Sequence, residues 1–138
     1  MTTAAIKSFG TLLKSTGTTV KEVGDIVGPD ISRGVVDATT HDSTGGWQEW
    51  VPGKLSPGKV TFKINWLPTD ATHSAAAGLI NDITAATLQT FTITYTDTGN
   101  LVASFSAYVT GFKINAPVDG MLTADVEMTI TGAITFTP

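Results

Sequence analysis

The chain has 138 residues, no cysteine, a formal net charge of −4 and only 14% charged residues. This length predicts one domain with one core, and the lack of cysteine excludes a disulfide framework and a thiolate metal site. Sparse, acidic charge argues against tight binding to nucleic acid, which needs clustered Lys and Arg, and the short apolar runs exclude a membrane-spanning helix. Low charge also gives only weak electrostatic repulsion between copies of the chain, so the composition favours self-assembly.

The first 33 residues are irregular and are punctuated by glycines, with short strands predicted over 11–14 and 18–23. Few of their apolar residues recur with a period that could anchor a core. We therefore expect residues 1–16 to form an extended N-terminal arm or edge hairpin. The first well-defined strand is predicted over 35–40.

A long connection follows over residues 41–58, although most connections in compact domains run to roughly 4–6 residues. It carries Trp47, Trp50, Val51 and Leu55 between glycine and proline hinges, a composition unlike that of a disordered segment. Trp is enriched at binding hot spots, so these four residues are the candidate interaction site. Trp66, by contrast, shares a face with Phe62 and Ile64 and is assigned to the core.

Strict alternation of apolar and polar residues predicts a strand over 60–66. Apolar residues at helical spacing then predict one helix over 69–86, with Asp70 or Thr72 as its N-cap. His73 is placed in the first turn of that helix. Gly78 weakens the prediction, because glycine is unfavourable inside helices.

The C-terminal part is predicted to be β-structure. Alternation predicts a hairpin over 91–109, a bulge at Gly111, and a long last strand bent at Gly132. The fold class is therefore mainly β: a β-sandwich or partial barrel of two antiparallel sheets, with one flanking helix. Asp125 and Glu127 alternate with the apolar row of the last strand, so they face away from the core.

No catalytic or metal-binding constellation emerges from the sequence. His41, Asp42 and Ser43 are the residue types of a hydrolase triad, but they are consecutive and point to opposite sides of an extended segment. The two histidines, His41 and His73, have no metal-ligand spacing, and no glycine-rich loop has the context of a phosphate site. We predict neither an enzyme nor a cofactor.

Two functions stay open from the residues alone. Trp47 and Trp50 could pack against another protein, or they could stack on a sugar as in a monomeric glycan-binding β-sandwich. They could also fold back over one end of the core.

The order and spacing of several stretches resemble the tail tube proteins of long-tailed, non-contractile bacteriophages, of the phage lambda major tail protein type. The similarity is carried by VDATTHDSTGGWQEWVPG, GKVTFKINWLPTDATHSAAAGL, FTITYTDTGN and FSAYVTGFKINAPVDGMLTADVEMTITGAITF. It spans nearly the whole chain, as one tail-tube-type domain over 1–138 without the additional C-terminal immunoglobulin-like domain of some relatives.

The resemblance implies a structural virion protein that forms rings of six, stacked into a tube through which DNA is ejected. Implied partners are other copies of the chain, the tape measure protein, and tail terminator or tip proteins. DNA would pass without specific binding, no membrane would be involved, and assembly would take place in the host cytoplasm. In such a tube, Asp125 and Glu127 are candidates for the lumen, where a ring of like charge would repel DNA.

Overall fold

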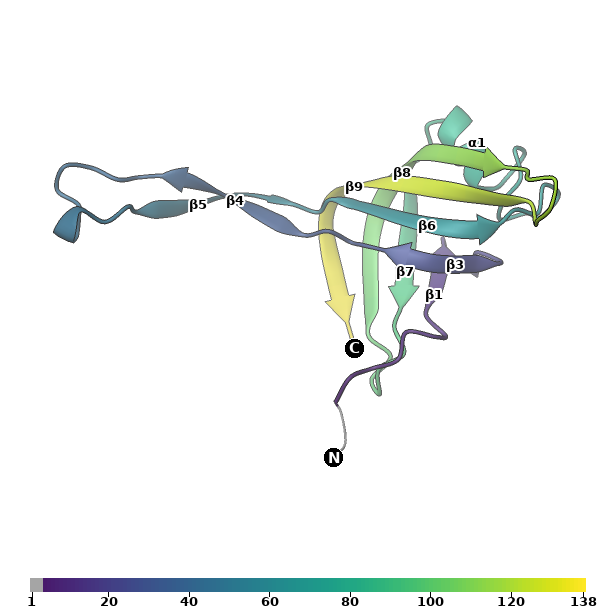
Figure 1. Ribbon diagram of the computed structural model, residues 1–138, viewed down its shortest axis with the longest axis horizontal. Coiled ribbons are helices and arrows are strands. Elements are labelled where there is room, and N and C mark those ends of the chain that lie inside the picture. Colours follow the sequence, from purple (N-terminus) through teal and green to yellow (C-terminus); the bar gives the residue numbers. More distant parts are fainter. Residues whose placement is uncertain (1–3) are drawn as a thin grey trace.

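The computed structural model of the protein describes residues 4–138 and is mainly β (Figure 1). Seven strands form one sheet in the order β2-β1-β7-β8-β9-β6-β3, and every neighbouring pair is antiparallel. Two further strands, β4 and β5, pair only with each other. The bounds are β1 Leu12–Ser15, β2 Thr18–Thr19, β3 Val23–Val27, β4 Ser32–Asp37, β5 Trp50–Ser56, β6 Lys59–Asn65, β7 Gln89–Thr94, β8 Val102–Asn115 and β9 Thr123–Thr137.

The predicted fold class is confirmed, but the two expected layers are two parts of one sharply curled sheet. Strands β8 and β9 are long enough to belong to both parts (Figure 1). Their pairing shifts register between Val109 and Gly111, which is the predicted bulge, and again near Ser104. The predicted bend at Gly132 lies beside that second shift, where the glycine has a φ of +83°. The curl encloses the core.

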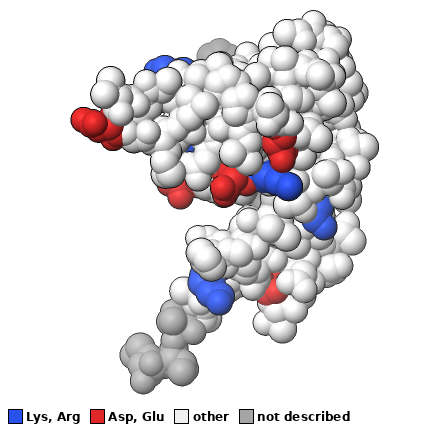
Figure 2. Space-filling view, turned by 90° about the vertical axis from the view of Figure 1, so that its right-hand side faces the viewer, with Lys and Arg blue, Asp and Glu red and all other residues white. Residues whose placement is uncertain are grey.

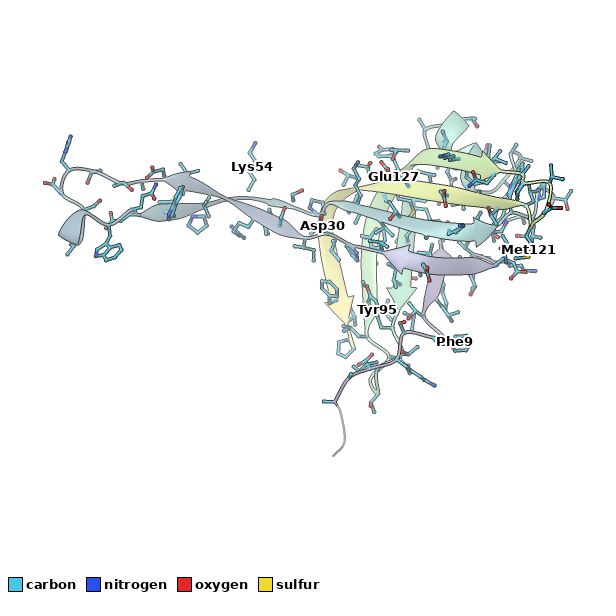
Figure 3. All side chains as sticks on the ribbon, viewed as in Figure 1. Phe9, Asp30, Lys54, Tyr95, Met121 and Glu127 are labelled. Atoms are coloured by element: carbon cyan, nitrogen blue, oxygen red, sulfur yellow. The ribbon has the colours of Figure 1, made fainter. Side chains whose placement is uncertain are left out.

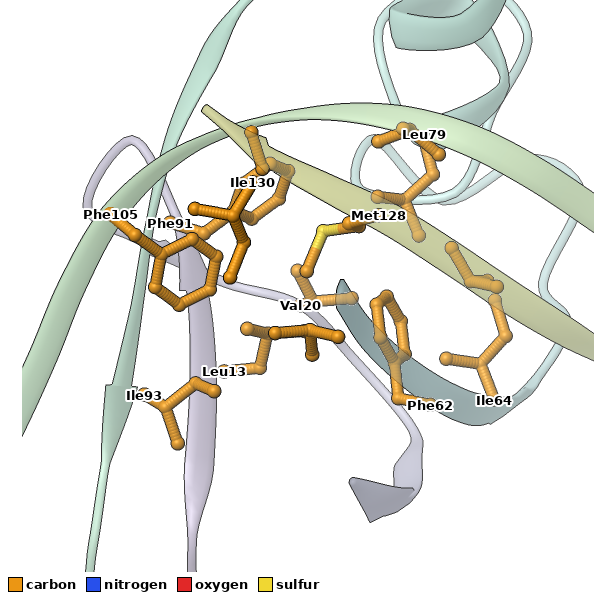
Figure 4. Close-up of a cluster of buried hydrophobic side chains, with 14 of the residues drawn as sticks. Leu13, Val20, Phe62, Ile64, Leu79, Phe91, Ile93, Phe105, Met128 and Ile130 are labelled. Carbon is orange, nitrogen blue, oxygen red and sulfur yellow. The ribbon is translucent and has the colours of Figure 1, made fainter. Parts of the chain in front are cut away.

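The core contains the apolar side of each predicted strand (Figure 4). Phe91 and Phe105 stack with ring centroids 6.2 Å apart. Trp66 is only partly buried, although its ring packs edge-on against Phe112 at 5.9 Å. The buried apolar residues are Leu13, Val20, Val60, Phe62, Ile64, Leu79, Phe91, Ile93, Ala103, Phe105, Ala107, Val109, Ala124, Val126, Met128 and Ile130.

The N-terminal prediction was too broad. Residues 12–15 form β1, which pairs with β7, and Leu13 is only 1% exposed. Val20, just after β2, is also buried. The sequence hid this anchoring because Leu13 lies between Leu12 and Lys14, and Val20 between Thr19 and Lys21, so neither belongs to a run of alternating apolar residues that would mark a buried face. The arm is therefore shorter than residues 1–16; its residues 1–3 lie outside the described part of the chain.

The helix prediction over 69–86 was also too long. Helix α1 covers only Leu79–Thr84, and its N-cap position is Gly78 instead of Asp70 or Thr72. A Cβ at Gly78 would lie 2.4 Å from the backbone nitrogen of Ser74, so the preceding turns fold back onto the helix start. Asp70 instead accepts a hydrogen bond from the backbone N–H of Thr72 within those turns.

The predicted loop over 41–58 contains the tip and the second strand of a β-hairpin whose first strand is β4. Strands β4 and β5, with the short 3₁₀ turn η1 at Thr44–Gly46, extend far from the sheet as a two-stranded ribbon (Figure 1). We call this element, residues 32–56, the projecting hairpin. Among residues 4–138, no helix is long and apolar enough to cross a membrane.

Candidate functional site

The projecting hairpin exposes apolar side chains on both of its faces. Cross-strand partners share a face, and the pairs Val36–Val51 and Asp37–Trp50 point in opposite directions. Trp47 is 77% exposed, Trp50 52% and Leu55 62%. A lone two-stranded hairpin is at best marginally stable in water, and contiguous exposed apolar surface marks an interaction site. The four predicted residues thus lie on one element that reaches away from the body.

Hydrogen bonds at the hairpin tip join the segment that follows β4 to the residue that precedes β5. The backbone N–H of Glu49 donates to the Thr39 hydroxyl at 2.8 Å, and the Ser43 hydroxyl donates to the Glu49 carboxylate at 3.0 Å. The Ser43 oxygen also accepts from the backbone N–H of Thr40. The Ser43 side chain thus bonds both to the backbone and to the Glu49 carboxylate.

Two close backbone contacts fix the base of the hairpin. Gly58 has a φ of +74°, and a Cβ there would lie 2.2 Å from the carbonyl oxygen of Asp30. A Cβ at Gly28 would lie 2.4 Å from the carbonyl oxygen of Lys59. The Gly58 carbonyl also accepts a hydrogen bond from the backbone N–H of Ile130, 3.2 Å away. Since only glycine permits both approaches, the hairpin leaves the body in a defined direction.

The second candidate surface is the outward side of the four-stranded part of the sheet, formed by β3, β6, β9 and the second half of β8. We call it the charged face. Asp125 and Glu127 lie on it as predicted, because their neighbours Ala124, Val126 and Met128 are buried. It is hollowed into an open trough of about 460 Å³ lined by residues that include Asp25, Lys63, Lys113, Asp125 and Glu127.

The charge on this face is balanced, which changes the expected ring of like charge. Lys63 and Lys113 lie directly opposite Asp125 on the two flanking strands, and the Lys59 ammonium lies 3.2 Å from the Glu127 carboxylate. Figure 2 looks at the molecule from the end opposite the hairpin, where acidic and basic side chains also lie near one another. The lysines lie far from the acids in sequence, so the sequence signal from Asp125 and Glu127 alone could not reveal them.

The N-terminal segment, residues 4–11, is the third exposed element. The Thr96 hydroxyl donates a hydrogen bond to the Lys7 carbonyl, which ties the segment to the turn between β7 and β8. Phe9 is 88% exposed and Ile6 64%, and Figure 3 shows Phe9 pointing away from the sheet. The segment therefore adds apolar side chains to the surface but none to the core.

Two buried polar residues were not recognised in the sequence. His73 is fully buried: the backbone N–H of Leu67 donates to its Nδ1 at 3.1 Å, so its Nε2–H donates to the Lys21 carbonyl at 2.7 Å. Asp82 is 4% exposed and accepts from the Gln89 side chain at 3.1 Å. Burial raises the pKa of the Asp82 carboxyl, and the Gln89 hydrogen bond acts in the opposite direction. His73 thus joins distant segments of the chain, whereas Asp82 joins α1 to the start of β7.

No group of three or more metal-ligating side chains comes together in the part of the chain that the structure describes. The charged face offers alternating ammonium and carboxylate groups, and the hairpin offers aromatic and aliphatic surface. Such surfaces can bind another macromolecule by shape, apolar contact and charge complementarity.

Known proteins of one family resemble this chain over almost its full length. Residues 4–137 match the family described as lambda phage tail tube protein. No curated protein sequence matches the chain. A solved structure titled "Virion of native gene transfer agent (GTA) particle" contains a similar chain with 19% identity and a TM-score of 0.72, covering 97% of this chain and all of that one.

A second similar chain comes from the structure titled "Tail of empty GTA particle computed with helical refinement, C6 symmetry". Its identity is 19% and its TM-score 0.65, covering 87% of this chain and 85% of that one. At such identities these two likenesses establish the fold, while the family match covers nearly every residue. The chain belongs to the lambda phage tail tube protein family and has a structural role in the virion tail.

Proposed function

We propose that this protein assembles into rings of six that stack into a hollow tube for DNA ejection. The observation that carries the proposal is the projecting hairpin, whose Trp47, Trp50, Val51 and Leu55 are all exposed on a ribbon with no core of its own. Such a ribbon gains stability when a partner covers it. In a family of tail tube proteins, the natural partner is another copy of the chain.

Rings would close through the two outer edges of the four-stranded part of the sheet, which carries the charged face. Within residues 4–138, β3 has no strand on its outer side, and β7 pairs with β8 only as far as Ala107. The second half of β8 is therefore a second open edge. Open edges accept strands from other chains, and joining β8 of one copy to β3 of the next repeats around an axis. Six such joints would form a barrel around a lumen.

Stacking would use the elements that reach beyond the ring. The hairpin is long enough to contact a neighbouring subunit or ring, with the four apolar residues as its contact surface. The N-terminal segment, with exposed Ile6 and Phe9, would contribute a second contact of the same kind. A contact that is heterologous and open along the axis produces a filament instead of a closed particle.

The charged face would line the lumen, with Asp125 and Glu127 toward the channel. Lysines and acids are equally represented among its charged residues Asp25, Lys59, Lys63, Lys113, Asp125 and Glu127. A wall of alternating signs produces a weak net field a few ångströms away, because neighbouring charges cancel. DNA would therefore pass without being held, and the net acidic chain would add mild repulsion.

The remaining partners follow from that role. A tape measure protein would occupy the lumen before DNA, and terminator or tip proteins would cap the two tube ends. Assembly would take place in the host cytoplasm. The protein would act without catalytic activity and without a cofactor.

Size-exclusion chromatography with light scattering, followed by negative-stain microscopy, tests the proposal. The expected result is a concentration-dependent shift from monomer to rings and tubes. A strict monomer at every concentration would contradict it. A monomer that also binds immobilised glycans, and loses them on Trp47→Ala with Trp50→Ala, would favour the glycan-binding alternative.

A further inference from the structure

Charges of opposite sign alternate along one row of the charged face. Asp125 on β9 lies directly opposite Lys63 on β6 and Lys113 on β8. Asp25 occupies the bulge on β3 between the pairs Val23–Ile64 and Ile26–Phe62, which places it beside Lys63. In the strand order β3-β6-β9-β8, the row therefore reads acid, lysine, acid, lysine. Opposite charges that face each other across strands are mutually stabilising.

The two ends of this row lie at the two open edges. Asp25 belongs to β3, the last strand of the sheet, and Lys113 belongs to the half of β8 that lies beyond its pairing with β7. Both residues are exposed, and among residues 4–138 neither forms an ion pair within 4.0 Å. Each end of the row thus presents one charge that has no opposite charge on its outer side, and the two end charges are opposite in sign.

Because the row of charges spans an even number of strands, it can continue from one copy of the chain into the next. Because four strands alternate in direction, β3 of one copy placed beside β8 of another is antiparallel to it. Four charges alternate in sign as well, so the same placement puts an acid beside a lysine. A two-fold pairing of like edges would instead bring Lys113 against Lys113, or Asp25 against Asp25. The charges therefore favour a head-to-tail ring over a symmetric dimer.

Exposed apolar side chains at both edges support the same partner. Ile114, next to Lys113, is 46% exposed although its cross-strand partner Ala124 is fully buried. Val27, two residues after Asp25, is 66% exposed. A strand added at either edge would cover these side chains.

We propose that Asp25 of one copy pairs with Lys113 of the next copy, and that this ion pair sets the register and the direction of the joint between subunits. The inference rests on the proposed ring assembly. The pair completes an unbroken ring of alternating charges around the lumen. Opposed edges and complementary charge are what a specific, heterologous interface requires.

A charge-swap experiment tests the pair. Asp25→Lys alone and Lys113→Asp alone each place like charges at the joint, and each should raise the concentration needed for assembly by about tenfold. The double variant should return to within about twofold of the wild-type protein. Asp119→Lys reverses an exposed acid in the turn before β9, outside both edges, and should assemble like the wild-type protein.

A cross-link provides a second readout. Since the natural chain has no cysteine, Asp25→Cys with Lys113→Cys introduces the only two thiols. Three strand spacings separate the two positions within one copy, about 14 Å, and a disulfide needs Cα atoms within about 7 Å. Oxidation should therefore give a ladder of linked chains that ends at the closed ring.

The outcomes separate the two proposals. A wild-type protein that never assembles contradicts the ring itself. Alternatively, the wild-type protein forms rings while the double charge swap fails to restore assembly and the double cysteine variant gives no cross-linked ladder. That result would contradict the Asp25–Lys113 joint but not the ring.

Discussion

Val36 and Val51 are direct cross-strand partners in the projecting hairpin, and yet both side chains are about half exposed, at 59% and 49%. Paired β-branched residues usually cover one another against a core. Here no core lies beneath them, so the pair stabilises the ribbon and also leaves apolar surface that a partner can cover. Trp50, whose pair with Asp37 points to the opposite face, and Trp47 near the tip are the two largest exposed side chains of the same hairpin.

Replacement of both Trp47 and Trp50 by alanine should leave a folded, soluble monomer that does not polymerise. Both side chains are exposed, so the free energy of unfolding should change by less than about 0.5 kcal/mol per site. Assembly should fail because the hairpin loses its main apolar contact area. Val118→Ala, at a fully exposed apolar residue outside the hairpin, is the control and should polymerise. Normal tubes from the double variant would rule out the role of the hairpin.

Deletion of residues 1–10 should weaken assembly while the melting temperature of the monomer stays nearly unchanged. Residues 4–10 are all exposed, Phe9 to 88%, and the Thr96 hydroxyl donates a hydrogen bond to the Lys7 carbonyl. Leu13→Ala is the contrasting variant, because Leu13 is in the core and its truncation should cost about 2–5 kcal/mol. If the deletion melts as early as Leu13→Ala, the segment belongs to the fold instead of the interface.

Gly58→Ala should displace or unfold the base of the hairpin, whereas Gly46→Ala should be tolerated. Both glycines have left-handed φ values, +74° and +75°, so alanine costs about 1–2 kcal/mol at either site from the backbone alone. Only at Gly58 does the new Cβ meet a backbone atom; at Gly46 nothing lies within 4 Å. Thermal unfolding and assembly measured on the pair isolate that contact. Equal effects at both sites would show that the close approach to Asp30 is unimportant.

The stability of the monomer should depend on the ionisation of Asp82. Its pKa is raised in the folded state, so the folded protein favours the protonated carboxyl. The contribution of Asp82 to stability is therefore fully present below the ordinary pKa of 3.8 and is lost as the pH rises from there through the raised value. Asp82→Asn mimics the protonated form and can still accept from Gln89. It should match the wild-type protein near about pH 3 and melt higher at about pH 7.

Chemical denaturation across this pH range checks the sign. A variant that is less stable than the wild-type protein at neutral pH would show that the ionised Asp82 stabilises the fold.

Much of the sheet could be predicted from the sequence, because a strand with one buried face has apolar residues at every second position. This holds for β6, β7, β8 and β9, including the bulge at Gly111. In the hairpin, the strand predicted over 35–40 overlaps β4, but β5 was missed, since both faces of the hairpin are exposed and β5 contains Gly and Pro. The helix was overestimated because the apolar spacing continues through Gly78, while the tight backbone contact there is a tertiary effect.

The candidate site was predictable only in part. Trp47 and Trp50 stand out in the sequence, and alternation places Asp125 and Glu127 away from the core. Their lysine neighbours, and the clamp that His73 makes between Leu67 and Lys21, depend on which strands and loops become neighbours. Register between distant strands is set by the whole fold, so local pattern cannot supply it.

Reconstruction of the assembled protein by electron cryomicroscopy tests the central claim most directly. The account predicts rings of six in which β8 of each copy adjoins β3 of the next, Asp125 and Glu127 face the lumen, and the hairpin lies on a neighbouring subunit. A map that places the charged face on the outer surface would contradict the lumen assignment. A protein that stays monomeric when concentrated, with its hairpin free, would contradict the account as a whole.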